Sequence, residues 1–221
     1  MTIGSALGPP PRKRGSYAKT AETRSRILAA AHDVARELGF HGVSLAEVAH
    51  RAGVAVGNVS YHFGSREELL HEVMQGVADR LREAVVQAGV AGRDVFERGE
   101  AALRAYLAFL RAHPWYVQMS EQVRSHRPDI YRRNLVFWLD LHRSAVREGI
   151  EEGTLRPMTD EELTATAYLI VGAHYFVDQM IEGTGGQSYP GDDIVVAAYM
   201  KLFRGGLESA RERKPSQESE S

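Results

Sequence analysis

The chain has 221 residues, of which 43% are hydrophobic and 25% charged, ordinary values for a protein with one full core or two smaller ones. It contains no cysteine, which excludes disulfides and thiolate metal sites, and no run of about 18 apolar residues that would predict a membrane-spanning helix. The N-terminus lacks the apolar core of a secretory signal, so we expect a cytoplasmic protein.

The net charge of −2 is distributed unevenly along the chain. Residues 1–66 contain nine Lys or Arg against four Asp or Glu, and the remainder contains 18 against 25, so the two parts carry +5 and −7. A basic N-terminal third on an acidic body indicates a polyanionic partner for that third. Residues 1–19 are predicted to be a disordered basic arm, which either lies on phosphates or remains a solvated tail.

Apolar residues recur at helical spacing after this arm. Gly39 stops a first helix whose apolar face is formed by Ile27, Ala31, Val34 and Leu38. Ser44 with Glu47 forms a capping box, in which each side chain satisfies a backbone N–H at a helix start. The pattern predicts three short helices before a longer one.

A second capping box, Ser65 with Glu68, opens the long helix, whose apolar stripe is formed by Leu69, Val73, Val77, Leu81 and Val85. Further helices are predicted over residues 93–112, 115–125, 128–151, 160–183 and 192–211. The sequence shows no alternating strand pattern and no internal repeat, so the predicted fold class is all-α. Residues 212–221 are expected to form a second disordered tail.

The spacing of Ala49, Gly53 and Val59 predicts how the second and third helices meet. Ala49 is small where two helices cross closely, and Gly53 suits a turn that needs positive φ. Val59 points back into a small core with Val48 and Val54. This is the steric pattern of a helix-turn-helix, and it leaves the outer face of residues 55–62 free to enter a major groove.

The flanks of this motif resemble the signature of the tetracycline-repressor (TetR) family. The matching positions, in order, are Thr23-Arg24, Ile27-Leu28, Ala30-Ala31, Gly39-Phe40, Val43-Ser44, Val48-Ala49, Ala52-Gly53-Val54, Gly57, His62-Phe63 and Glu67-Glu68-Leu69-Leu70. The resemblance implies an N-terminal helix-turn-helix DNA-binding domain at 20–66 and a larger helical ligand-binding and dimerisation domain at 67–211.

Three residues of the third helix are candidates for reading DNA bases: Val56, Asn58 and Tyr61. An Asn side chain can bond an adenine bidentately, and Val can touch a thymine methyl. Ser60 and His62, with Tyr61, suit contacts to phosphate or sugar. The family usually has Tyr at the position of Ser60, and here the aromatic residue is displaced to Tyr61.

Two further DNA contacts are expected at helix starts. Ser44 can present backbone N–H groups and a hydroxyl to a phosphate. Arg66 matches a family lysine that contacts the phosphate backbone, and it keeps the positive charge while adding a forked geometry.

The last two predicted helices carry small residues beside large ones: Ala167, Val171, Gly172, Ala173 and Val177, then Ala197, Ala198, Leu202, Gly205 and Gly206. Small residues permit close helix approach, as a four-helix dimer seam requires, although packing within one chain has the same need. Because the resemblance implies two-fold recognition of DNA, we expect a homodimer through these helices.

The resemblance also implies a ligand pocket between residues 100 and 180. Apolar walls with a few polar groups are offered by Tyr106, Trp115, Met119, Gln122, Phe137, Trp138, Leu141, His142, Tyr168, His174 and Tyr175. This mixture suits a largely apolar, aromatic or acyl effector, but aromatic residues at helical spacing also form plain core. Arginines at 124, 127, 132 and 133 either meet an anionic head group or form a solvated face.

The sequence shows no metal-ligand spacing, nucleotide-binding loop or nucleophile elbow, so no cofactor, metal or enzymatic activity is expected. The resemblance implies a ligand-responsive transcriptional regulator, most often a repressor, released from a palindromic operator by a small molecule. The chief alternative is a constitutive DNA-binding regulator whose C-terminal domain only dimerises. An enzyme with a DNA-binding appendage and a nonspecific architectural protein are the remaining alternatives.

Overall fold

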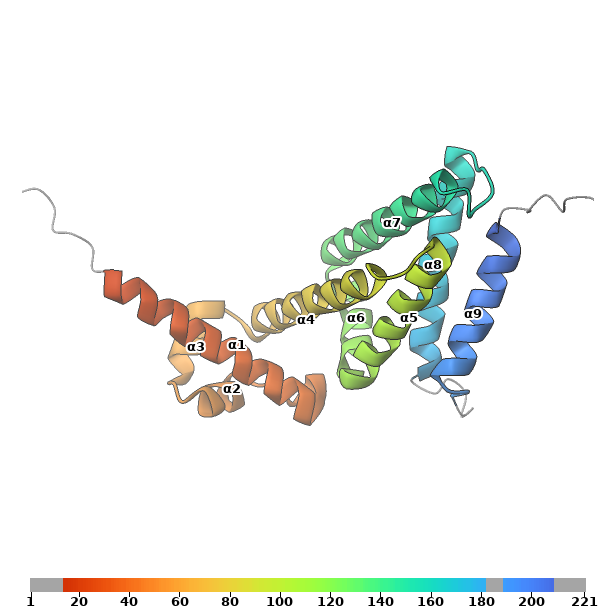
Figure 1. The fold of residues 1–221 in the computed structure, drawn as a ribbon. Helices are drawn as coiled ribbons and strands as arrows, with labels where there is room; N and C mark the ends of the chain where they lie inside the picture. The colour runs from red at the N-terminus through yellow and green to blue at the C-terminus, as the bar shows by residue number, and fades with distance from the viewer. Residues whose placement is uncertain (1–13, 182–188, 209–221) are drawn as a thin grey trace, which may run out of the picture. The chain divides into compact units, whose positions relative to one another are not determined.

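A computed structural model describes residues 14–181 and 189–208, where every element is an α-helix apart from one isolated β-bridge between Leu155 and Glu208 (Figure 1). The all-α prediction is confirmed. The helices are α1 (Arg14–Gly42), α2 (Leu45–Ala52), α3 (Val56–Phe63), α4 (Arg66–Gly89), α5 (Val95–Ala112), α6 (Pro114–His126), α7 (Pro128–Glu151), α8 (Asp160–Ile181) and α9 (Asp192–Leu207). The chain divides into two compact units, Met1–Gly76 and Val77–Ser221.

The helix boundaries follow the local signals in the sequence. Helices α6 and α7 begin at Pro114 and Pro128, because proline lacks the N–H that a first helical residue leaves unpaired. Helix α1 begins at Arg14, within the segment expected to be a disordered arm. The rest of the predicted arm and the predicted tail 212–221 lie outside the described residues.

In the first unit, α1, α2 and α3 pack on one another around a small apolar core. The side chains of Ile27, Val34, Val48 and Val59 are completely buried. Gly39 has φ = 69° and ψ = 177°, so it interrupts α1 where the sequence predicts a stop. Three short apolar faces thus close one core, and the opposite side of α3 remains exposed.

In the second unit, α7 packs on α8 and α6, and α5 packs on α9. One core cluster joins α5, α8 and α9 and consists of Leu103, Leu107, Val177, Val195 and Val196. A second cluster contains Phe96, Val146, Leu155, Leu163 and Ile170. The two clusters place α5, α7, α8 and α9 around a common interior.

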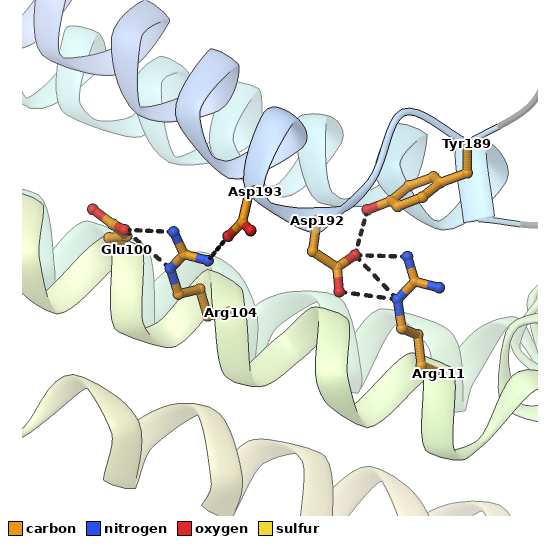
Figure 2. Close-up of polar contacts among 6 residues, drawn as sticks. All are labelled: Glu100, Arg104, Arg111, Tyr189, Asp192 and Asp193. Atoms are coloured by element: carbon orange, nitrogen blue, oxygen red, sulfur yellow. Dashed lines mark hydrogen bonds and ion pairs between the residues drawn. The ribbon is translucent and has the colours of Figure 1, made fainter.

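Polar contacts tie the start of α9 to α5 (Figure 2). The guanidinium of Arg111 contacts both carboxylate oxygens of Asp192, with Nη2 lying 2.8 Å from Oδ1. The Tyr189 hydroxyl donates to the same Oδ1 at 2.8 Å. Two turns earlier on α5, Nη1 of Arg104 lies 2.7 Å from Oδ1 of Asp193. These contacts fix the register of α9 against α5.

Asp192→Ala is expected to lower the free energy of unfolding by about 1 kcal/mol, because it removes a bidentate, partly exposed ion pair and the acceptor of the Tyr189 hydroxyl. Urea denaturation followed by circular dichroism measures this change. Asp79→Ala is the matched control, since Asp79 pairs with Arg82 on its own helix, α4. Equal losses for the two variants would show that the α5–α9 contacts add nothing specific.

Candidate nucleic-acid interface and ligand cavity

The turn between α2 and α3 has the geometry that the Ala49, Gly53 and Val59 spacing predicts. Gly53 adopts φ = 62° and ψ = 42°, the left-handed region, and Val54 N–H donates to the Ala49 carbonyl at 3.0 Å. A Cβ atom on Gly53 would lie 3.3 Å from Nη2 of Arg26. Ala49 and Val59 are both buried. The helix-turn-helix prediction is confirmed.

Arginines of the first unit bind other parts of that unit, a role that the sequence pattern did not reveal. Arg26 of α1 donates to the Ala52 carbonyl at the end of α2, and Arg24 binds Glu72 and lies 4.9 Å from the centroid of the Phe63 ring. Arg51 joins α2 to α1 through Glu37. These side chains hold α2 and α3 on α1, and much of the unit's positive charge is therefore compensated internally.

The outer face of α3 is open to solvent. Val56, Asn58, Ser60 and Tyr61 are exposed, while Val59 and Phe63 anchor the opposite face in the core. Tyr61 is 81% exposed, and its ring lies 5.2 Å from that of His62. A large aromatic side chain held out from a rigid helix, beside an amide, is suited to contact a partner surface.

Two of the remaining predicted DNA contacts, Ser44 and Arg66, make hydrogen bonds within the first unit. The Ser44 hydroxyl caps α2 by accepting the Glu47 N–H at 3.1 Å, which leaves its own hydrogen available for donation. Nε of Arg66 donates to the Val43 carbonyl, so the start of α4 is tied to the segment before α2. His62 is half-buried at the end of α3.

The second unit contains a partly open cavity of about 530 Å³ whose walls come from α4, α5, α6, α7, α8 and α9. Its apolar walls include Leu81, Val85, Leu103, Trp138, Ile170 and Phe203. Polar side chains among its walls include Tyr116, Ser120, Asn134, His142 and His174. A mostly apolar cavity of this size, with a few polar groups, has the character of a small-molecule site.

The residues predicted to bind a ligand fall into three groups. Those that line the cavity are Tyr106, Trp138, Leu141, His142, His174 and Tyr175. Trp115 is buried and Phe137 half-buried outside the lining, and Tyr168 is 55% exposed on α8. The side chains of Met119 and Gln122 lie outside the described set. The α4 and α9 walls, including Tyr199, were absent from the sequence prediction. The apolar residues of α4 have the pattern of an ordinary core-facing stripe, and α9 was assigned to the dimer interface.

The arginine group of α6 and α7 lies outside the cavity lining. Arg124 pairs with Glu121 at 2.7 Å, and Arg133 lies 3.6 Å from Asp129. Within the described ranges, no cluster of His, Asp or Glu side chains is arranged to hold a metal ion. No helix in that part of the chain is long and apolar enough to cross a membrane.

Comparison with known proteins connects this geometry to a family. Residues 27–73 match the family model described as "Bacterial regulatory proteins, tetR family". The chain is 31% identical over 147 residues to the HTH-type transcriptional regulator BetI of Klebsiella pneumoniae (strain 342), an alignment that covers 58% of this chain and 73% of BetI. It is 28% identical over 147 residues to BetI of Escherichia coli (strain SMS-3-5 / SECEC), with the same coverage.

Solved structures show the same fold. A TetR-family regulator from Pectobacterium atrosepticum superposes with a TM-score of 0.70 at 24% identity, covering 90% of this chain and 100% of that one. A TetR regulator from Chloroflexus aurantiacus J-10-FL gives a TM-score of 0.70 at 18% identity, covering 87% and 100%. These relatives and neighbours are transcriptional regulators. The chain belongs to the TetR family of DNA-binding transcriptional regulators.

Proposed function

We propose that this chain is a homodimeric repressor that binds a palindromic operator and is released from it by a small, largely apolar effector. The observation that supports this function best is the cavity of about 530 Å³ whose walls come from the six helices α4 to α9. A regulator that only dimerises has no need of such a space, because an apolar cavity forfeits packing energy. The effector would act through its different affinities for the DNA-binding and released conformations.

We assign base reading to the exposed face of α3. In this assignment Asn58 bonds an adenine edge, and Val56 and Tyr61 contact bases or sugars in the major groove. Ser44, Ser60, His62 and Arg66 are assigned to the phosphate backbone on either side. The exposure of Val56, Asn58 and Tyr61 and the firm anchoring of α3 through Val59 and Phe63 support this assignment.

The dimer surface is assigned to α8 and α9. Leu169 and Phe176 are 69% and 68% exposed on α8, and Leu202 is 76% exposed on α9. The exposed stripe also contains small residues, among them Ala165 and Ala198, which allow close helix approach. Ala167 and Val177, expected in the seam from the sequence, are instead buried inside the unit. A second copy is the occupant that fits this face, because a palindromic operator requires a two-fold protein. Tyr168, expected to bind the ligand, belongs to this exposed face.

Removing residues 1–13 is expected to reduce the salt dependence of DNA binding. Arg24 and Arg51 already bind carboxylates of the protein, so Arg12 and Lys13 become important sources of charge for phosphates. Each lost phosphate contact makes the negative slope of log K against log salt shallower by about 0.9. Fluorescence anisotropy at several salt concentrations measures the slope, and Arg12→Gln/Lys13→Gln is the matched variant. An unchanged slope would show that the arm is a solvated tail.

Release by an effector is tested with the full-length protein and an operator chosen by selection from random DNA. The wild type and an Ala145→Phe variant, which fills part of the cavity, are exposed to a bacterial metabolite extract. Bound molecules are identified by mass spectrometry, and each is tested for its effect on operator affinity. We expect a molecule that binds only the wild type and weakens its operator binding at least about tenfold. If no such molecule is found, the regulator is constitutive.

A further inference from the structure

Two histidines form a pair in the wall of the cavity. His142 of α7 and His174 of α8 both line it, and their ring centroids are 5.2 Å apart. The Nε2 atoms of both rings are shielded from solvent and have no hydrogen-bond partner among the described residues. A shielded, unpaired ring nitrogen is unfavourable in a folded protein, and most such groups have a partner. Both rings also line the cavity, so a bound molecule can supply a partner to a ring nitrogen that faces it.

The surroundings of the pair keep both imidazoles uncharged at neutral pH. Loss of solvation lowers the pKa of His142 to about 4, and loss of solvation together with the neighbouring His142 lowers the pKa of His174 to about 3. A neutral imidazole offers one N–H donor and one acceptor nitrogen. The pair can thus receive either a hydroxyl or a carbonyl group.

The cavity offers little to compensate a charge next to these rings. Of its charged lining residues, Arg98 pairs with Glu152 at 2.8 Å, and Glu148 is exposed. The ring of His174 stacks on Tyr199, with centroids 5.5 Å apart and planes at 9°, and lies 5.2 Å from Tyr106. The Tyr199 ring in turn packs on the Phe203 ring, and their centroids are 4.4 Å apart. Because these aromatic faces pack against one another, they do not form an open cage for a cation.

We propose that His142 and His174 are the polar anchor of the cavity and select an uncharged ligand that carries one hydroxyl or carbonyl group on a largely apolar body. This proposal rests on the proposed function, in which the cavity binds an effector, and it specifies the chemistry of that effector. The stacked Tyr199 ring and the tilted Tyr106 ring both contact His174 and hold it in a fixed orientation, so the polar group of the ligand is recognised at a defined position.

The test uses four probes that share one apolar body: biphenyl, biphenyl-4-methanol, biphenyl-4-carboxylate and (biphenyl-4-yl)trimethylammonium. Isothermal titration calorimetry of the full-length protein at pH 7.4 ranks their affinities. We expect the alcohol to bind about five- to tenfold tighter than biphenyl, because it gains one hydrogen bond, and both ions to bind at least about tenfold more weakly than the alcohol.

The double variant His142→Phe/His174→Phe keeps two rings and removes their nitrogens, so the alcohol is expected to lose its advantage over biphenyl. His113→Phe, which makes the same exchange in the same unit outside the lining, should keep that advantage. If either ion binds wild type more tightly than the alcohol, or if the advantage survives the double variant, the anchor is wrong while the ligand cavity stands. If none of the four probes binds, both the anchor and the effector site are overturned. Should the double variant fail to fold, the wild-type ranking alone decides.

Discussion

Leu202→Glu is expected to convert the dimer into monomers and to lower operator affinity by about a hundredfold or more. Leu202 is 76% exposed on α9, and burial against a second copy would place each new carboxylate in an apolar seam without a partner. Two-fold symmetry introduces the substitution twice. A monomer then loses the gain from binding two half-sites together, which is commonly 10²- to 10⁴-fold. Sedimentation velocity and fluorescence anisotropy measure the two effects.

Val136→Glu is the matched control for this experiment. Val136 is also an exposed apolar residue of the second unit, 54% exposed on α7, but it lies outside the α8–α9 face. The control should remain dimeric with unchanged operator affinity. A Leu202→Glu protein that remains dimeric would place the interface elsewhere.

Asn58→Ala and Tyr61→Ala are each expected to weaken operator binding by about 10- to 100-fold, while the dimer and its melting temperature remain unchanged. A bidentate base contact contributes about 1–3 kcal/mol of discrimination, which corresponds to this range. Both side chains are exposed, so truncation removes little packing within the protein. Anisotropy with the selected operator and with shuffled DNA separates lost specificity from lost general affinity.

Asp33→Ala, at an exposed position of α1, is the control in the same unit. It should bind the operator like the wild type. Wild-type affinity in both α3 variants would mean that α3 is not the recognition helix.

Much of the fold was predictable because local sterics determine it. The left-handed turn at Gly53 and the buried Val59 follow from spacing alone, since few other arrangements of these residues close a small core. The starts of α6 and α7 follow from Pro114 and Pro128. Local signals of this kind do not depend on distant parts of the chain.

Features that depend on tertiary contacts could not be predicted from the sequence in the same way. Helical periodicity shows that Tyr168 and His174 lie on one helix, but it does not show which face meets the cavity and which meets solvent. The hydrogen bond from Arg26 to the Ala52 carbonyl joins two helices, and nothing in either local pattern predicts it. Tyr199 was overlooked for the same reason, because its contacts with His174 depend on how α8 and α9 pack.

The most direct test is selection of DNA from a random library, followed by comparison of the affinities for the selected site and for its shuffled sequence at physiological salt. For an α3 that reads bases in a two-fold dimer, we expect a palindrome with half-site centres about one helical turn apart, preferred by about 10³-fold or more. Equal affinity for the selected and shuffled DNA would contradict sequence-specific reading and indicate nonspecific binding.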